Sequence, residues 1–290
     1  MEDELSTELD KQEAVAHGAR TLPMFSLEDR VAVVTGAGSG IGQRISIGFA
    51  SCGAEVVLVD INEAGLVETV ELINATVSDA RAPWPVKCDV SQEDQVVSLF
   101  NGVQSRFGRV DVLLNGAFTP VLARPHALTL ELWQRSVDVN LTGYFLCARS
   151  AGQAMIEAGR GSIINISSIA GVSGLGRGNF VYSVTKGGIV QMTRELAVEW
   201  GRYGIRVNAI LPVQTRTKGF QARLDHPDTD APGLTGRVLG AIPLGRMAEP
   251  EDFVGPSVFL ASDASAMVSG TMLPVDGGNL AMNASARADE

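Results

Sequence analysis

Two residues suited to proton transfer stand four positions apart in this sequence. Tyr182 and Lys186 belong to the run Val-Tyr-Ser-Val-Thr-Lys, and the whole chain has 3 tyrosines. A spacing of four places both side chains on one face of a helix. A free phenol is a poor base with a pKa of about 10, but a neighbouring ammonium favours the phenolate and lowers that pKa. The pair predicts removal of a proton from an alcohol as hydride leaves, or its return to a ketone. By itself the spacing fits a chance pairing equally well.

A glycine-rich turn gives the second chemical signal. Gly36, Gly40 and Gly42 follow the apolar run 31–35 with the spacing G-x-x-x-G-x-G, and a helical pattern comes next. Such a turn lets the backbone approach a pyrophosphate closely, at the helix end that attracts negative charge. The sequence therefore predicts a dinucleotide site at this turn.

Asp60, at the end of the next apolar run, predicts which dinucleotide binds. A carboxylate there accepts hydrogen bonds from the adenosine ribose hydroxyls and repels a 2′-phosphate, and Ile61 and Asn62 after it bring no cation. We therefore predict NAD rather than NADP, although an aspartate that merely caps a turn would look the same. Asp89, just after the third apolar run, is placed for a contact with the adenine amine.

The elements that must position these residues alternate regularly from Arg30 onward. Apolar runs predict seven strands, at 31–35, 56–60, 85–88, 110–114, 162–167, 206–210 and 272–275. Helical patterns lie near 41–52, 64–77, 93–107, 130–157, 182–203 and 250–262. Continuous apolar strands with intervening helices indicate a parallel sheet covered on both faces. We predict a single Rossmann-type, doubly wound α/β domain over residues 25–280, with a seven-stranded parallel sheet.

Residues 211–242 interrupt this rhythm. They are rich in proline and glycine around a charged centre. A long irregular insertion in a compact domain is either a functional lid or a loose loop. Its place after the sixth strand, at the carboxyl edge where ligands bind, favours a substrate lid.

Composition and charge exclude several classes of protein. A formal charge of −10 and a pI near 4.9 argue against a general nucleic-acid binder. The chain has no apolar run long enough for a membrane span, which takes about 18 residues, and the acidic residues 1–20 do not resemble a signal peptide. We predict a mobile acidic tail over 1–24 (or a partner-binding segment), a second tail over 281–290, and a cytoplasmic protein. The cysteines, expected to be reduced, fit that compartment: they are Cys52, Cys88 and Cys147.

The ordered motifs resemble those of the classical short-chain dehydrogenase/reductase family over about residues 25–280. The glycine turn and the Tyr–Lys pair carry the likeness first. Further matches are Val-Asn140-Leu-Thr-Gly, Asn-Ile-Ser-Ser168-Ile-Ala-Gly, the segment 206–212 and Val-Asp-Gly-Gly278.

The resemblance implies a role for each residue of a catalytic set. Tyr182 would be the general acid/base, and Lys186 would lower its pKa and bind the nicotinamide ribose. Ser168 would hold and polarise the substrate oxygen; we prefer it to Ser167 because it directly precedes Ile-Ala-Gly. Asn140 would anchor a water that links Lys186 to solvent.

The resemblance also implies the contacts to the cofactor, with two departures from the family pattern. Where the family has Asn-Asn-Ala-Gly, this chain has Asn115-Gly-Ala-Phe118, and its Pro-Gly is Pro212-Val213. Valine is less permissive in backbone conformation than glycine, so the loop shape is expected to differ. The expected cofactor-binding residues are Gly36, Ser39, Gly40, Ile41, Gly42, Asp60, Asp89, Val90, Asn115, Tyr182, Lys186, Thr215 and Thr217.

The histidines and basic residues of the sequence give little evidence for a metal site or for the charge of the substrate. No metal site is predicted, because no ligand-like spacing with cysteine or carboxylate surrounds the histidines His17, His126 and His226. Four basic residues could gather at the pocket mouth and favour an anionic substrate, although exposed basic side chains are more often merely solvated: Arg177, Arg216, Lys218 and Arg223.

The leading hypothesis is NAD-dependent interconversion of a secondary alcohol and a ketone on a small polyol- or sugar-like substrate. An alternative is a hydroxysteroid or 3-oxoacyl substrate, suggested by apolar residues near the expected pocket: Phe118, Leu122, Phe180 and Phe220. An alternative of another class is a non-enzymatic NAD-sensing interaction protein; the intact catalytic set argues against it, because a sensor needs no proton relay. The resemblance implies a homo-oligomer, commonly a tetramer, assembled through the helices near 130–157 and 182–203.

Overall fold

Seven strands form one parallel sheet at the centre of the molecule. The structure, a computed structural model, describes residues 22–78, 80–225 and 230–283. The strand order is β3-β2-β1-β4-β5-β6-β7, with every pair parallel. The strands are β1 (Val31–Thr35), β2 (Glu55–Asp60), β3 (Trp84–Lys87), β4 (Val112–Asn115), β5 (Gly161–Ile166), β6 (Ile205–Pro212) and β7 (Met272–Val275). The predicted doubly wound fold is confirmed.

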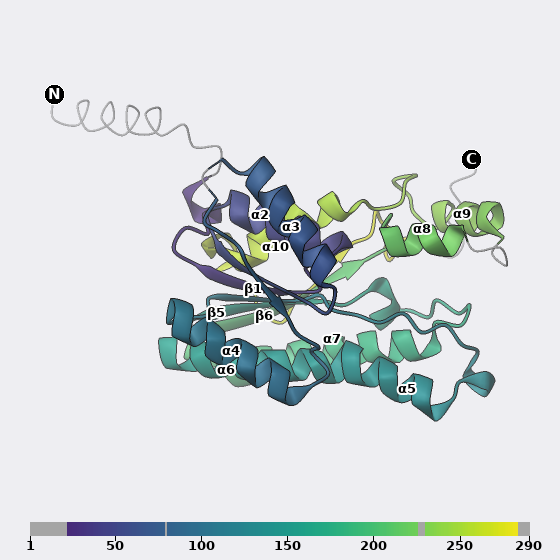
Figure 1. The fold of residues 1–290 in the computed structure, drawn as a ribbon. Helices are drawn as coiled ribbons and strands as arrows, with labels where there is room; N and C mark the ends of the chain where they lie inside the picture. The colour runs from purple at the N-terminus through teal and green to yellow at the C-terminus, as the bar shows by residue number, and fades with distance from the viewer. Residues whose placement is uncertain (1–21, 79, 226–229, 284–290) are drawn as a thin grey trace, which may run out of the picture.

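Helices cover both faces of this sheet (Figure 1). One layer holds α2 (Gly40–Ser51), α3 (Glu63–Thr76) and α10 (Val254–Ala261); the other holds α4 (Glu93–Phe107), α5 (Leu130–Val137), α6 (Gly143–Ala158) and α7 (Phe180–Trp200). Neighbouring strand residues point to opposite layers: Val34 packs in one apolar cluster with Ile45 of α2, and Val33 in the other with Val103 of α4. Burial from both sides explains why residues 31–34 of β1 are all apolar.

The helix expected near 130–157 is not one regular helix. Between α5 and α6 the chain makes a π turn, η3 (Asp138–Thr142), in which the Gly143 amide bonds to the Asp138 carbonyl. A π turn widens the helix and is common at functional sites. Here it carries Asn140, which sequence periodicity alone does not distinguish from its neighbours.

The prediction of an irregular segment at 211–242 is wrong in part. β6 extends through Pro212, and the segment then contains α8 (Lys218–Leu224) and α9 (Ala231–Leu239). Proline sits in the first turn of α9, where it needs no hydrogen-bond partner, and the Asp230 side chain caps that turn by accepting from the Gly233 amide at 3.0 Å. The proline and glycine that suggested a loop therefore begin a helix.

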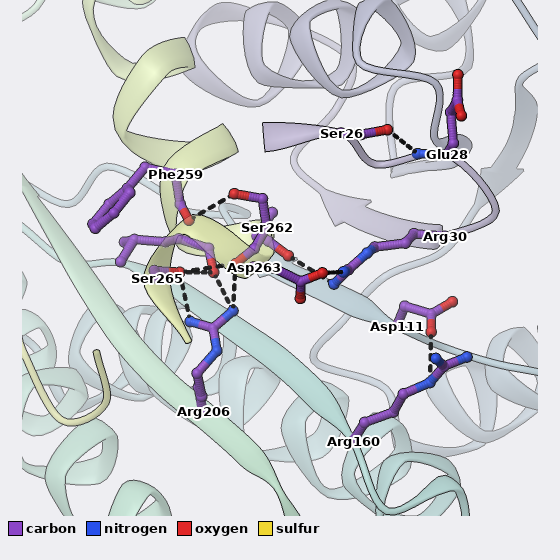
Figure 2. Close-up of polar contacts among 12 residues, drawn as sticks. Ser26, Glu28, Arg30, Asp111, Arg160, Arg206, Phe259, Ser262, Asp263 and Ser265 are labelled. Atoms are coloured by element: carbon purple, nitrogen blue, oxygen red, sulfur yellow. Dashed lines mark hydrogen bonds and ion pairs between the residues drawn. The ribbon is translucent and has the colours of Figure 1, made fainter. Parts of the chain in front are cut away.

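The amino ends of the strands carry a polar network, on the edge opposite the carboxyl ends (Figure 2). Arg30, just before β1, pairs with Asp263 at 2.7 Å. Arg206 of β6 reaches the Ser265 hydroxyl at 2.8 Å and the Leu260 carbonyl at 2.8 Å, at the end of α10. Asp111 is 5% exposed and accepts the Val31 amide at 2.9 Å. These contacts tie the beginnings of β1 and β6 to the end of α10 and the turn after it, away from the glycine turn.

The remaining predictions on organisation concern the termini and cysteines. Most of the two predicted tails lies outside the described residues, as do His17 and His226; Pro23–Phe25 forms one 3-10 turn. Cys52, Cys88 and Cys147 are free thiols. No helix of the described ranges is both long and apolar enough to cross a bilayer.

Candidate active site

A cleft of about 1230 Å³ opens at the carboxyl edge of the sheet. It spans the ends of β1 and β4, where the strand order reverses and doubly wound sheets bind their ligands. The turn after β1, the ends of β5 and β6, and the helices α8 and α9 supply its other walls. The predicted lid therefore borders the cleft.

The glycine turn has no room for side chains at its critical points. A Cβ on Gly36 would lie 2.8 Å from the Gly116 backbone, and one on Gly42 would lie 2.3 Å from the Gly36 carbonyl oxygen. Gly36 and Gly40 have φ of +73° and +56°, which glycine adopts without strain. With Ser39, Ile41 and Gly42, they line the cleft at the start of α2. This backbone cradle fits a dinucleotide pyrophosphate.

Asp60 lies beside this turn at the end of β2. One carboxylate oxygen accepts the Gly38 amide at 3.0 Å and the other accepts the Asn62 amide at 2.9 Å. Two basic residues described in this region are already paired: Lys87 with Glu63 at 3.4 Å, and Lys218 of α8 with Glu68 at 2.8 Å. Asp60 thus both holds the turn and presents negative charge to the cleft.

The other predicted cofactor residues surround the same cleft. Asp89 caps its own turn through the Ser91 amide and hydroxyl, at 3.0 and 2.7 Å, and lines the cleft with Val90. Thr215 and Thr217 also line the cleft. The Thr217 hydroxyl accepts the Phe220 amide at 3.1 Å, so it begins α8.

Tyr182, Ser168 and Lys186 come together deep in the cleft. Tyr182 and Lys186 lie one turn apart on α7, and Ser168 follows β5 at the start of the 3-10 turn η4 (Ile169–Gly171). The Ser168 hydroxyl bonds to Tyr182, which lowers the phenol pKa, but burial has the larger effect and raises it. Ser167 also lines the cleft, but its hydroxyl donates to the Lys186 carbonyl at 2.9 Å.

Lys186 lies one turn from Tyr182 on α7, and its amine is held by two other oxygens. Its Nζ donates to the Ile166 carbonyl at 2.7 Å and to the Tyr144 hydroxyl at 3.2 Å, and lies 5.8 Å from the centroid of the Tyr182 ring. Burial at 2% exposure lowers the pKa of Lys186 to about 7, because desolvation disfavours its charged form.

Two predicted residues, Asn140 and Asn115, are buried behind the cleft rather than in its lining. The Asn140 side chain bonds to both backbone groups of Thr119, at 2.7 and 3.0 Å, and so fixes the loop after β4. Asn115 Nδ2 donates to Asn165 Oδ1 at 3.0 Å, which joins β4 to β5. The side chains of Asn140 and Asn115 therefore hold the backbone around the cleft in place without lining the cleft themselves.

The two departures from the family pattern have structural reasons. A Cβ on Gly116 would lie 2.8 Å from the Thr35 carbonyl oxygen, so this turn has no space for a larger residue. Val213 is 6% exposed and packs in the core cluster below the lid. Phe118 is 57% exposed and lines the cleft.

Two of the four basic residues expected near the pocket mouth, Arg177 and Lys218, line the cleft. Arg216 pairs with Glu249 at 3.6 Å and Lys218 with Glu68; the Arg223 side chain lies outside what the structure describes. His126 lies in the turn η2 (Pro125–Ala127). The described residues contain no cluster of metal-ligating side chains.

Two residues missed by the sequence reasoning help to build the site. Thr35 ends β1, and its hydroxyl accepts the amides of Gly116 and Ala117 at 3.0 and 3.3 Å. Tyr144 reaches Lys186. The available signal for Tyr144 was its place four residues after Asn140, on the same helical face, in a chain with only 3 tyrosines.

Comparison with known proteins gives extensive matches. A family model described as enoyl-(acyl carrier protein) reductase matches residues 36–279. The D-threitol dehydrogenase of Mycolicibacterium smegmatis is 38% identical over 254 residues, which are 88% of this chain and 94% of that protein. The NAD-dependent glycerol dehydrogenase of Listeria innocua is 35% identical over 88% of this chain and 95% of its own. A solved candidate NAD(P)-dependent gluconate 5-dehydrogenase from Beutenbergia cavernae, with NADP bound at low occupancy, aligns with a TM-score of 0.82 and 37% identity over 89% of this chain and 100% of its own.

Proposed function

Because the chain belongs to the short-chain dehydrogenase/reductase family, we propose that it is an NAD-dependent oxidoreductase that interconverts a secondary alcohol and a ketone. The observation that carries this proposal is the meeting of Tyr182, Ser168 and Lys186 in a cleft that begins at a glycine cradle. A binding module needs the cradle but has no use for a buried acid–base group beside it. The geometry therefore favours an enzyme over an NAD sensor.

The protein's own residues would divide the reaction among them. Ser168 holds the substrate oxygen beside the Tyr182 hydroxyl, which accepts its proton during oxidation and returns it during reduction. Lys186 supplies positive charge that favours the phenolate when it is protonated. Asn140 keeps the loop after β4 in place against the cleft. A bound nicotinamide supplies the hydride chemistry.

NAD is the proposed cofactor, on the strength of Asp60. Its carboxylate is placed by the glycine turn and meets no free cation among the described neighbours Lys87 and Lys218, which are both paired. A 2′-phosphate would meet negative charge there. The NAD-dependent glycerol dehydrogenase supports this choice, whereas the NADP-bound gluconate 5-dehydrogenase candidate shows that the same fold accepts the other cofactor.

A small polyol or sugar-like compound is the proposed substrate. The threitol and glycerol dehydrogenases among the relatives support it, and the polar residues Asn179 and Gln214 line the cleft. The runner-up, a hydroxysteroid or 3-oxoacyl compound, is favoured by Phe118, Leu122 and Phe220 on the same walls. Phe180 instead packs on Trp133, 6.1 Å between ring centroids.

The test is reduced-nicotinamide formation from polyols, sugars, hydroxysteroids and hydroxyacyl thioesters, each with NAD and with NADP. We expect turnover of polyols with NAD, and a loss of about 100-fold or more in Tyr182→Phe, since proton transfer by a placed group is worth that much. Tyr203→Phe, at the far end of α7 in the 3-10 turn η5 (Gly201–Tyr203), is the matched control. Activity that survives in Tyr182→Phe, or a clear preference for NADP, would overturn the corresponding part of the proposal. Tight NAD binding without turnover on any substrate would favour the sensor.

A further inference from the structure

We propose that Tyr144 is a positioning residue for this reaction: its buried hydroxyl holds the Lys186 amine and helps it to carry the positive charge that Tyr182 needs. The inference rests on the proposed function for its meaning in catalysis. Its structural content, a hydrogen bond that supports a buried ammonium, is independent of the substrate.

A closed set of three hydrogen bonds surrounds the lysine amine. Lys186 Nζ donates to Tyr144 Oη at 3.2 Å and to the Ile166 carbonyl at 2.7 Å, and Tyr144 Oη donates to that same carbonyl at 3.1 Å. Tyr144 is 1% exposed and Lys186 is 2% exposed. The amine lies 5.0 Å from the centroid of the Tyr144 ring and 5.8 Å from that of Tyr182. Lys186 thus lies between two phenols, one inside the protein and one at the cleft.

The surroundings leave the ammonium few other sources of support. An ammonium has three N–H donors, of which two are used by Ile166 and Tyr144. The third N–H donor can bond to a group in the cleft, which Lys186 lines. No carboxylate pairs with Lys186 within the described part of the chain. A buried charge without an opposite charge depends on the neutral oxygens and ring faces around it.

Tyr144 acts as a neutral acceptor and does not titrate with the site. Burial raises the pKa of Tyr144 well above its ordinary value. The titratable groups around the amine are Tyr144 and its neighbour Cys147 on α6, and Tyr182 on α7; β5 contributes the uncharged Ile166 carbonyl. Burial raises the pKa of the Cys147 thiol as well. Tyr144 and Cys147 therefore keep their protons over the pH range in which Lys186 titrates.

The fold fixes Tyr144 in this position. The residue stands in the first turn of α6, directly after the π turn, and its backbone carbonyl accepts Asn115 Nδ2 at 3.5 Å. A buried phenol would already be satisfied by its bond to Ile166. The second bond, from Lys186, is what gives Tyr144 a part in the chemistry.

The experiment compares Tyr144→Phe with Tyr203→Phe and with the unmodified protein. The pH profile of alcohol oxidation is measured from pH 6 to 10, together with a tyrosinate absorbance titration. Loss of the Tyr144 hydroxyl as an acceptor makes the protonated form of Lys186 less favourable. The Tyr182 phenolate, which that positive charge stabilises, becomes less favourable with it. We therefore expect the acid limb and the Tyr182 titration to move up by about one pH unit, since a hydrogen bond to a charged group is worth that much. Activity below the limb falls about tenfold, and Tyr203→Phe leaves both curves in place.

Other results would overturn the inference. An unmoved titration, with activity lowered equally at every pH, would mean that Tyr144 is a packing residue alone; a downward shift would mean that it restrains Lys186 from Tyr182. The titration needs no turnover, so it decides the matter even if the proposed substrates fail. If Tyr144→Phe does not fold, 3-fluorotyrosine placed at position 144 keeps the shape and weakens the acceptor, and it should move both curves in the same direction by less.

Discussion

Lys186 joins catalysis to stability at the scale of a single residue. Its pKa in the folded protein is about 7, because burial disfavours the charged form, whereas an exposed lysine has a pKa of about 10.4. Between these values the unfolded chain holds a proton at this position that the folded chain does not. Folding therefore becomes more favourable as pH rises through this window, and below it the contribution of Lys186 is constant.

Lys186→Met removes this dependence. The free energy of unfolding of the unmodified protein minus that of the variant should increase by about 1.4 kcal/mol per pH unit between about pH 8 and 9.5, the value of one unit of pKa. Urea unfolding at several pH values and one protein concentration measures it. A difference that stays constant over this range would show that Lys186 is not strongly desolvated.

The residues that react were easier to predict than those that support them. Tyr182 and Lys186 can be identified from their residue types and spacing, and Ser168 from its motif. The partner of Lys186 could not be predicted in this way, because Tyr144 reaches it from another helix, α6, of the same layer. Such a contact depends on how α6 packs, which local sequence does not specify.

At the scale of elements, the junction of β1 and β4 controls the site. Thr35 at the end of β1 receives the Gly116 and Ala117 amides that follow β4, and Gly36 lies against Gly116. The two strands meet where the order of the sheet reverses, so a small displacement here moves the glycine cradle and the loop held by Asn140 together.

Gly116→Ala should therefore weaken both the fold and the cofactor site. Its Cβ would lie 2.8 Å from the Thr35 carbonyl oxygen, a backbone atom that can shift only with the strand. We expect a loss of about 1–3 kcal/mol, the usual effect of overpacking, and weaker NAD binding. Gly255→Ala, in α10 where a Cβ meets nothing within 4 Å, is the control and should be neutral or slightly stabilising. Equal effects from both substitutions in urea unfolding and NAD titration would contradict this account.

The elements themselves were predicted where their pattern is local. The five inner strands follow from continuous apolar runs, because burial on both faces requires them. The edge strands β3 and β7 are partly exposed and were placed from shorter runs. The π turn within the helix near 130–157 and the helices α8 and α9 did not follow. In α9, Leu234 and Val238 lie on one buried face, but the proline and glycine before and between them conceal that short period.

At the scale of the whole molecule, the outer helices suggest how copies assemble. Phe145 of α6 and Val184 and Val198 of α7 are 46%, 42% and 80% exposed. Exposed apolar residues on these two helices are candidates for contact with a second copy. We propose a tetramer in which these helices form the main contact, as expected from the family.

Light scattering after size exclusion tests this assembly. We expect the mass of a tetramer, and a smaller species when Val198→Lys is combined with Phe145→Glu, because charges are excluded from the centre of an interface. Val67→Lys on α3, 55% exposed in the opposite layer, should leave the mass unchanged. A monomer in the unmodified protein, or dissociation by Val67→Lys, would refute the proposed surface.

The three free thiols divide among the layers: Cys52 at the end of α2, Cys88 just past β3 in the sheet, and Cys147 within α6. Burial raises the pKa of each, that of Cys88 to about 11, which lowers thiol reactivity; Cys88 and Cys147 are also shielded from reagents, whereas Cys52 is partly exposed. The rate at which each thiol is alkylated consequently reports how accessible its own layer is. The order in which an alkylating reagent reaches them would record which layer of the folded molecule opens first, without any label being added.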